Sequence, residues 1–193
     1  FIKSIDKFES EGKTTMIVAE KGKVIGIIAV ADALKEDSVL AIASLNSEGY
    51  ETVMITGDNE RTAKAIAKEA GISEVIANVL PEDKAKKVAE LQKKGMVAFV
   101  GDGINDAPAL KQSNVGIAMG TGTDIAIESG DIVLAKGSLI GVTQAINLSK
   151  ATFRKIKQNL FWAFAYNVVA IPLAVAGVLH PVVAEIAMAL SSI

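Results

Sequence analysis

The stretch that most constrains the fold is a short apolar run that ends abruptly at glycines and acids. Residues 97–100 are apolar, and Gly101-Asp102-Gly103-Ile104-Asn105-Asp106-Ala107-Pro108 follows directly. A buried strand that feeds a tight loop has this pattern, because glycine lets the backbone turn sharply and approach a ligand. In open α/β sheets, ligands bind at the edge formed by the carboxyl ends of the strands. Asp102 and Asp106 therefore predict a site for Mg²⁺, which prefers carboxylates, waters and phosphate oxygens.

Two upstream stretches predict related chemistry. Thr56-Gly57-Asp58-Asn59 follows a second apolar run, and Pro81-Glu82-Asp83-Lys84 begins a helical pattern. The Thr56 hydroxyl and the backbone N–H groups of Gly57 and Asp58 precede a helix, and a helix start suits a phosphate group. This loop is therefore predicted to bind a phosphate.

Lys84 adds a positive charge, and Asn105 lies between the two carboxylates. A hydroxyl, an ammonium group and a magnesium-binding carboxylate cluster are what phosphoryl transfer needs besides its nucleophile. Each stretch alone has a plainer interpretation, because Gly, Asn and Asp form turns and a lysine in a first helical turn is usually solvated. Their combination in this order, at strand ends, favours phosphoryl transfer.

The rest of the first 150 residues alternates between strand and helix patterns. Apolar runs predict strands over residues 14–19, 24–30, 53–55, 75–76, 97–100, 115–118 and 132–134. Amphipathic runs predict helices over residues 38–48, 60–70, 81–94 and 107–112. The first two strands form a hairpin, and the others alternate with helices, which predicts an α/β fold with a parallel sheet and right-handed crossovers.

Composition excludes several classes of protein. The 193 residues, half of them apolar, are enough to bury one full domain core. A formal charge of −2 argues against a nucleic-acid partner. The chain has no cysteine, which excludes a disulfide framework and a thiolate metal site. It begins Phe-Ile-Lys-Ser, which is neither an initiator methionine nor a signal peptide, so it is expected to be a piece of a longer protein.

The last part of the chain predicts a membrane helix. Four basic residues between 150 and 157 precede an apolar stretch over 159–179. About 20 apolar residues span the hydrocarbon core as a helix, and basic residues mark its cytoplasmic end. A second apolar stretch over 182–193 begins a return helix that is too short to cross. A buried helix of a soluble core is the alternative, but the length and uniform polarity of the stretch favour a membrane.

Polar residues within these apolar stretches predict an ion site. Tyr166 and Asn167 lie mid-helix, where polar groups are costly in lipid unless they face a partner or a pathway. Met188 and Ser192 are four residues apart and share a helix face. A thioether suits a soft ion such as Cu(I). Plain packing of Met188 and a helix contact through Ser192 are the alternatives.

The three cytoplasmic motifs together resemble the later signature motifs of P-type ATPases, within the haloacid dehalogenase superfamily. The resemblance implies a haloacid dehalogenase-like (Rossmann-like) parallel sheet followed by transmembrane α-helices. It divides the chain into the end of a nucleotide-binding domain (1–31), a phosphorylation domain (32–150) and membrane helices, one full and one truncated (151–193).

The resemblance also assigns roles to the motif residues. The catalytic residues it implies are Thr56, Gly57, Asp58, Lys84, Asp102, Asn105 and Asp106. Thr56, Gly57 and Lys84 bind the phosphoryl group of ATP and stabilise its charge. Asp102 ligates Mg²⁺, with Asn105 and Asp106 holding that site.

The polar residues of the membrane stretches resemble the transport motifs of copper-exporting heavy-metal P-type ATPases. The resemblance implies ATP-driven Cu(I) export, with Tyr166, Asn167, Met188 and Ser192 as the Cu(I) site. Zinc-exporting relatives carry charged residues there, and Glu185 is the only candidate in this chain. The expected partners are membrane lipid, the remaining segments of the same pump and a copper chaperone, and the expected location is a prokaryotic cell membrane, crossed several times.

One departure from the family pattern limits these expectations. The Asp-Lys-Thr-Gly motif that carries the phosphorylated aspartate is absent from the chain, so this piece alone is expected to be inactive. Asp32 resembles the hinge residue between the nucleotide-binding and phosphorylation domains. Two alternatives stay open: a soluble Mg²⁺-dependent phosphatase with Asp32 as its nucleophile, and a non-catalytic membrane-tethered remnant.

Overall fold

The computed structural model describes residues 1–31, 34, 36–177, 182 and 185. The chain forms two compact units, residues 1–143 and residues 144–193, and each is described by itself. The first unit carries the strands and the three predicted motifs, and the second carries most of one long helix.

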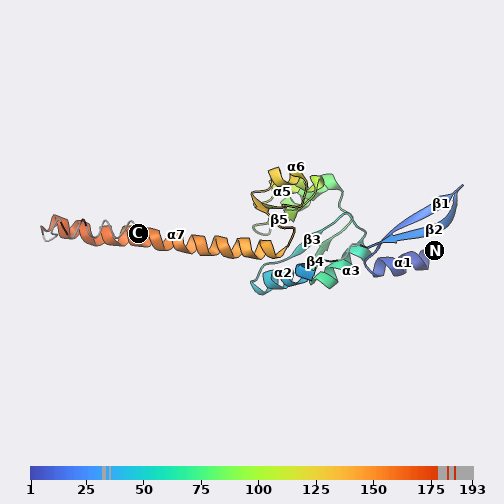
Figure 1. The fold of residues 1–193 in the computed structure, drawn as a ribbon, viewed down its shortest axis with the longest axis horizontal. Coiled ribbons are helices and arrows are strands. Elements are labelled where there is room, and N and C mark those ends of the chain that lie inside the picture. Colours follow the sequence, from blue (N-terminus) through green and yellow to red (C-terminus); the bar gives the residue numbers. More distant parts are fainter. Residues whose placement is uncertain (32–33, 35, 178–181, 183–184, 186–193) are drawn as a thin grey trace. The chain divides into compact units, whose positions relative to one another are not determined.

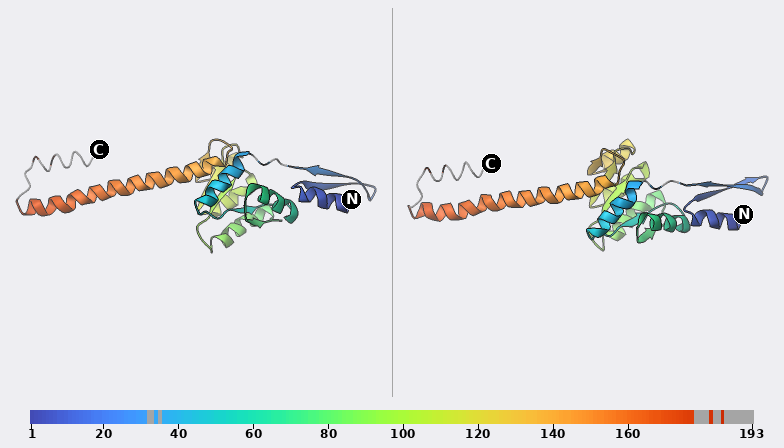
Figure 2. Two further views of the ribbon diagram at one scale, coloured as in Figure 1. Left: turned by 90° about the horizontal axis from the view of Figure 1, so that it is seen from below. Right: turned by 60° about the horizontal axis from the view of Figure 1, so that its bottom comes forward.

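The amino-terminal part of the first unit is a helix followed by a hairpin. Helix α1 (Ile2–Ser10) precedes strands β1 (Thr14–Glu20) and β2 (Lys23–Val30), which pair antiparallel. The turn between the strands has two residues with left-handed backbone, Lys21 (φ 47°) and Gly22 (φ 79°), as a two-residue hairpin turn requires. The predicted hairpin is confirmed, whereas helix α1 was not predicted. Figure 2 shows α1 beside helix α3 (Glu60–Ala70), against which it packs.

The hairpin leaves apolar side chains exposed on both of its faces. Met16 lies opposite Ile28, and Ile17 lies opposite Ile27, so these two pairs face opposite sides of the hairpin. Met16, Ile17, Ile25 and Ile28 are each more than half exposed.

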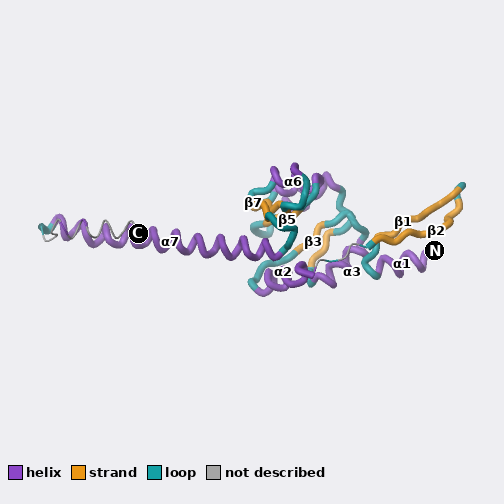
Figure 3. Tube along the Cα trace, viewed as in Figure 1, coloured by secondary structure: helices purple, strands orange, loops and turns teal. Residues whose placement is uncertain are grey.

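Strands and helices then alternate along the chain, as predicted (Figures 1 and 3). The elements of this part are α2 (Glu36–Ser47), β3 (Val53–Ile55), α3 (Glu60–Ala70), β4 (Glu74–Ile76), η1 (Pro81–Asp83), α4 (Lys84–Leu91), β5 (Ala98–Gly101), η2 (Ile104–Asp106), α5 (Ala107–Gln112), β6 (Val115–Met119), α6 (Asp124–Ser129) and β7 (Ile132–Leu134). Strand β3 pairs parallel with β4, and β6 lies between β5 and β7, parallel to both. The predicted haloacid dehalogenase-like architecture of parallel strands and helices is confirmed.

The core lies around the three-stranded part of this unit. Leu110, Ala118 and Ala126 are buried together, and Phe99 packs against them. Helix α5 approaches β6 so closely that a Cβ at Gly116 would lie 2.7 Å from the Leu110 carbonyl oxygen. This close packing fixes the strand ends from which the motif loops leave.

The long apolar helix is α7 (Ile140–Val175), which has 36 residues. It is the only helix in the described part of the chain that is long and apolar enough to cross a membrane, and an 18-residue stretch of it has a mean hydropathy of 1.3. Residues 159–175 of the predicted apolar stretch thus lie on a helix that begins well before residue 159. Pro172 lies inside the helix, and Gly177 (φ 69°) follows its end.

Candidate functional site

The first motif is a loop that hydrogen bonds hold between β3 and α3. The backbone N–H of Thr56 donates to the Ile76 carbonyl at 3.0 Å, and the Thr56 carbonyl accepts the N–H of Val79 at 3.0 Å. The Asp58 carbonyl accepts the N–H of Asn78 at 2.8 Å. The loop is therefore fixed to the segment that leads from β4 towards the second motif.

Within this loop, the Thr56 hydroxyl is oriented by Asp58. It donates to Asp58 Oδ2 at 2.8 Å and accepts the backbone N–H of Asp58 at 3.1 Å. Gly57 is exposed, and Asn59 caps helix α3 by accepting the N–H groups of Arg61 and Thr62 at 3.0 Å each. The loop thus presents an exposed backbone at the start of an 11-residue helix, an arrangement suited to an anion.

The second and third motifs meet in a largely buried ion pair. Lys84 Nζ lies 2.7 Å from Asp106 Oδ1, and the two side chains are 19 % and 12 % exposed. The other oxygen of Asp106 accepts the backbone N–H of Gly103 at 3.2 Å. Pro81 starts the turn η1, whose fixed backbone leads into α4 with Lys84 as the first α4 residue. The Asp106 carboxylate is thus held at both oxygens.

Two glycines leave room for the Asp106 side chain and for the backbone of Asp102. A Cβ at Gly101 would lie 2.7 Å from the Cβ of Asp106, a distance that real side chains essentially never show. A Cβ at Gly122 would lie 2.4 Å from the Asp102 carbonyl oxygen, which accepts the N–H of Thr123 at 3.0 Å. The sequence interpretation missed Gly122 and Thr123. Both residues follow the end of strand β6, just as the first and third motifs follow strands β3 and β5. This shared position after a strand could have identified them in the sequence.

Asp102 differs from Asp106 in having an exposed side chain. Among the residues that the structure describes, no side chain pairs with the Asp102 carboxylate, and none hydrogen-bonds the exposed Asn105 amide. The described residues also contain no group of three or more His, Cys, Asp or Glu side chains that could hold a metal. One exposed carboxylate still fits Mg²⁺, which keeps several waters and commonly takes one or two carboxylates plus phosphate oxygens.

The structure brings the predicted cytoplasmic residues together in two groups. Thr56, Gly57 and Asp58 form one, and Lys84 and Asp106 form the other, with Asp102 four residues from Asp106 along the same loop. The segment from Ile76 to η1 connects the groups through its hydrogen bonds to the first loop.

The predicted ion site is only partly described. Tyr166 and Asn167 lie in α7, and the Asn167 side-chain amide donates to the Ala163 carbonyl of the same helix at 2.7 Å. Met188, Ser192 and the hinge residue Asp32 lie outside the described residues.

Comparison with curated proteins finds relatives that match both units of the chain. The model of a family described as haloacid dehalogenase-like hydrolase matches residues 1–114. The chain is 57 % identical to a copper-exporting P-type ATPase of Staphylococcus haemolyticus, over 97 % of the chain and 24 % of the relative. It is 53 % identical to a protein of the same name from Bacillus subtilis, over 98 % of the chain and 24 % of the relative. The chain thus spans about a quarter of the length of these curated relatives.

Solved structures give a similar result with a different metal. A crystal structure of a zinc-transporting PIB-type ATPase matches with a TM-score of 0.85 and 42 % identity, over 99 % of this chain and 32 % of that chain. Another crystal structure of a zinc-transporting PIB-type ATPase, in a different state, matches with a TM-score of 0.78 and 44 % identity, over 92 % of this chain and 29 % of that chain.

Proposed function

Because the chain belongs to the haloacid dehalogenase-like hydrolase family, we propose that it is part of an ATP-driven P-type pump that exports Cu(I) across a membrane. The observation that carries this proposal is the Lys84–Asp106 ion pair beside the exposed carboxylate of Asp102. It provides a fixed positive charge and a ligand for a cation at one loop. Phosphoryl transfer depends on positioning and charge neutralisation of this kind.

The cytoplasmic residues divide the work of phosphoryl transfer. The Thr56 hydroxyl and the backbone of Gly57 bind the phosphoryl oxygens at the start of α3. Lys84 uses one of its three ammonium donors on Asp106, and the other two are available to the phosphoryl group. Asp102 would hold Mg²⁺, which supplies further neutralisation of phosphoryl charge when bound. Asp106, held at both oxygens, keeps Lys84 and the Asp102 loop in place.

The phosphate acceptor is expected on another segment of the pump, since this chain has no Asp-Lys-Thr-Gly sequence. In the described residues, β3 pairs only with β4, and β5 pairs only with β6 and not with β3. A further parallel strand on the open edge of β3 or β5 would bring an acceptor carboxylate to the strand ends that carry Thr56 and Asp102. The remaining segments of the pump are therefore necessary partners.

The transported ion is assigned to the apolar helices. No Asp, Glu, Lys or Arg occurs from Gln158 to Ala184, and Glu185, the one carboxylate of the second apolar stretch, lies near its loop end, so a bound ion finds no compensating formal charge deep in either stretch. Tyr166, Asn167, Met188 and Ser192 offer neutral oxygens and a soft thioether, which suit monovalent Cu(I) better than Zn²⁺. The higher identity to copper-exporting relatives than to zinc-transporting structures supports the same choice. A multi-pass location in a prokaryotic cell membrane and delivery by a copper chaperone remain predictions.

The test is metal-stimulated ATP hydrolysis by the intact pump under reducing conditions, with Cu(I), Ag(I) and Zn²⁺ compared. Cu(I) and Ag(I) should stimulate and Zn²⁺ should not, because the ligands are soft and neutral. Met188→Ala and Asn167→Ala should lower stimulation without changing phosphorylation by inorganic phosphate. Met96→Ala is the matched control, because Met96 is 84 % exposed in the first unit.

The possible results test separately whether copper is the cargo and whether the protein is a pump. Equal stimulation by Zn²⁺, or full Cu(I) stimulation of Met188→Ala, would remove copper as the cargo while leaving the pump assignment. An intact protein that forms no phosphoenzyme from ATP and Mg²⁺ under any metal would remove the pump assignment itself. Asp102→Asn should abolish that phosphoenzyme, because the amide loses the charge that holds the cation.

A further inference from the structure

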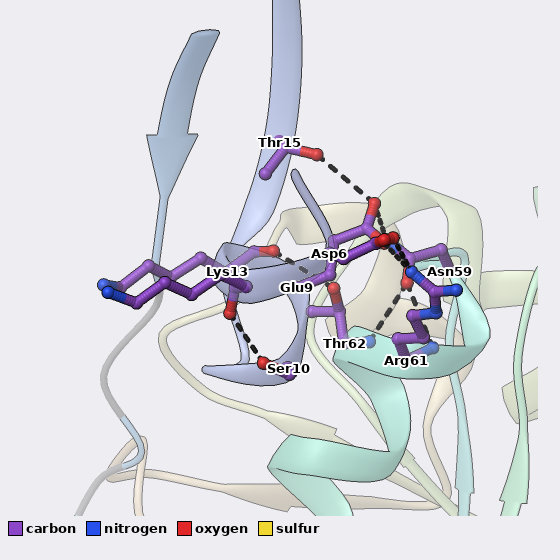
Figure 4. A network of polar contacts seen from close by, with 9 residues as sticks. Asp6, Glu9, Ser10, Lys13, Thr15, Asn59, Arg61 and Thr62 are labelled. Carbon is purple, nitrogen blue, oxygen red and sulfur yellow. Dashed lines mark hydrogen bonds and ion pairs between the residues drawn. The ribbon is translucent and has the colours of Figure 1, made fainter. Parts of the chain in front are cut away.

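A network of polar contacts joins the amino-terminal segment to the phosphate-binding loop (Figure 4). One side of the network comes from α1 and the start of β1. The other side comes from the loop before α3 and the first turn of that helix. These two parts of the chain lie far apart in sequence: Glu9 and Asn59, which are in contact, are separated by 50 positions.

Glu9 is the centre of this network. Its Oε1 accepts the Asn59 side-chain amide at 3.3 Å and the Thr15 hydroxyl at 3.3 Å. Its Oε2 lies 3.8 Å from Arg61 Nη1, and the Glu9 side chain is only 17 % exposed. The side-chain NH₂ group of Asn59 donates to Glu9, and its side-chain oxygen Oδ1 caps α3. Glu9 therefore fixes the orientation of the capping side chain.

Thr14 contacts the loop at a second point, the Asp58 carboxylate. The Thr14 hydroxyl donates to Asp58 Oδ1 at 3.2 Å, while the Thr56 hydroxyl donates to Asp58 Oδ2 at 2.8 Å. To donate to a phosphoryl oxygen, the Thr56 hydroxyl has to leave Asp58. The bond from Thr14 then still satisfies the carboxylate and holds it in place, so that it neither recaptures the hydroxyl nor turns towards the incoming anion.

Packing keeps the two sides of the network together. The Thr62 side chain, 1 % exposed, donates to the Lys13 carbonyl at 3.1 Å. Arg61 also forms an ion pair with Asp6, and α1 packs along α3. Gly12, with φ 75°, brings the chain from α1 into β1, and a Cβ at this position would lie 3.6 Å from Ile66 Cγ1. The segment thus lies against the helix whose start forms the phosphate site.

We propose that Glu9 and Thr14 are positioning residues of the phosphate-binding loop, through which docking of the α1–β1 segment raises the affinity of the site for a phosphoryl group. The inference rests on the proposed role of Thr56 in binding phosphate. Coupling of this kind is reciprocal, so a bound phosphoryl group also stabilises the docked segment. The phosphate site and the amino-terminal segment therefore act as one thermodynamic unit.

The experiment measures inhibition of the intact pump by orthovanadate, a phosphate analogue, in variants of the network. Thr14→Val should raise the vanadate concentration for half-inhibition by about three- to tenfold, the effect of losing one hydrogen bond. Glu9→Gln should raise it by about two- to threefold, because the amide keeps an acceptor oxygen but replaces charge-assisted hydrogen bonds by weaker neutral ones. Thr14→Ser should restore the original value, because it keeps the hydroxyl. The matched controls are Thr52→Val, whose hydroxyl bonds Asn46 instead, and Glu60→Gln, an exposed acid next to Arg61 on the same helix.

A purely structural role predicts other results. If Thr14→Val lowers thermal stability but leaves vanadate inhibition unchanged, or if Thr14→Ser is as impaired as Thr14→Val, the inference is wrong. Glu9→Gln tests it separately should Thr14→Val fail to fold, because the amide keeps the size of the carboxylate and loses its charge. Failure of the unmodified pump to form a phosphoenzyme would instead refute the proposed function.

Discussion

Two lysine–carboxylate pairs in the first unit have nearly the same length and very different surroundings. Lys84 and Asp106 are 2.7 Å apart with side chains 19 % and 12 % exposed, whereas Lys64 and Glu60 are 2.6 Å apart with side chains 66 % and 65 % exposed. Solvent screens the exposed pair, and pairs of that kind contribute little to stability. Removing one partner of a buried pair leaves a charge without compensation, which is costly. The difference teaches that burial, more than distance, decides what an ion pair does in this chain.

Burial also fits the different roles that we propose for the two pairs. A largely buried pair loses hydration, and pairing in a protein interior does not by itself repay that loss. In the proposed function, the Lys84–Asp106 pair supplies a fixed positive charge for phosphoryl transfer. The Glu60–Lys64 pair is an i,i+4 contact on the surface of α3, where solvent screens it and leaves only weak support for the helix.

The largest expected effect comes from removing the lysine of each pair. Lys84→Met in the intact pump should reduce phosphoenzyme formation from ATP by about 100-fold or more, because charge stabilisation at a reacting group is lost. Lys64→Met should form phosphoenzyme at the unmodified rate. Rapid-quench measurement with labelled ATP distinguishes them, and similar rates for the two variants would contradict the assigned role of Lys84.

An intermediate effect is expected from crowding the buried pair without removing a charge. Gly101→Ala places a Cβ 2.7 Å from that of Asp106, and overpacking of this kind typically costs about 1–3 kcal/mol of stability. Gly95→Ala is the matched control, because a Cβ there meets nothing within 4 Å. Thermal unfolding of the two variants in detergent gives the measurement. A Gly101→Ala variant as stable as Gly95→Ala would show that Asp106 can shift freely, contrary to its fixed geometry.

The smallest effect is expected at the exposed pair. Lys64, hydrogen-bonded to Glu60, holds the pKa of the Glu60 carboxyl below its usual range. A carboxyl with a lowered folded-state pKa adds stability above its unfolded pKa of about 4.3 and loses it as the pH falls through the folded value. Glu60→Gln should therefore shift the unfolding midpoint by no more than about 1 °C at pH 7, because the pair is screened, and the difference should vanish as the pH falls through the lowered pKa of Glu60. A shift as large as that of Gly101→Ala would mean that exposure does not govern these pairs.

Periodicity predicted the long and regular elements well. Strands β3 and β7 and helices α3 and α5 have the predicted bounds, because apolar runs, an Asn cap and a closing glycine mark them in the sequence. Helix α6 was missed although it is as long as α5, because no proline marks its start as Pro108 marks the start of α5. Helix α1 was missed because its N-cap residue, Phe1, offers no capping side chain.

The candidate site could be predicted as a set of residues but not as a set of contacts. Strand-end motifs placed Lys84 and Asp106 at the same edge, because parallel strands bring their carboxyl ends together. Nothing in the sequence pairs these two residues, which are 22 positions apart, and nothing couples Glu9 to Asn59. Such contacts depend on tertiary packing, which local patterns do not encode.

The hairpin of β1 and β2 has a consequence for how this chain behaves at high concentration. Within the described residues each strand pairs only with the other, so the outer edge of each offers unpaired N–H and C=O groups. Isoleucine and methionine side chains cover both faces, and more than half of the surface of Met16, Ile17, Ile25 and Ile28 is exposed. Open edges flanked by apolar faces are templates for adding strands from other molecules. The stretch is therefore a nucleus for self-association wherever no further strand or layer covers it.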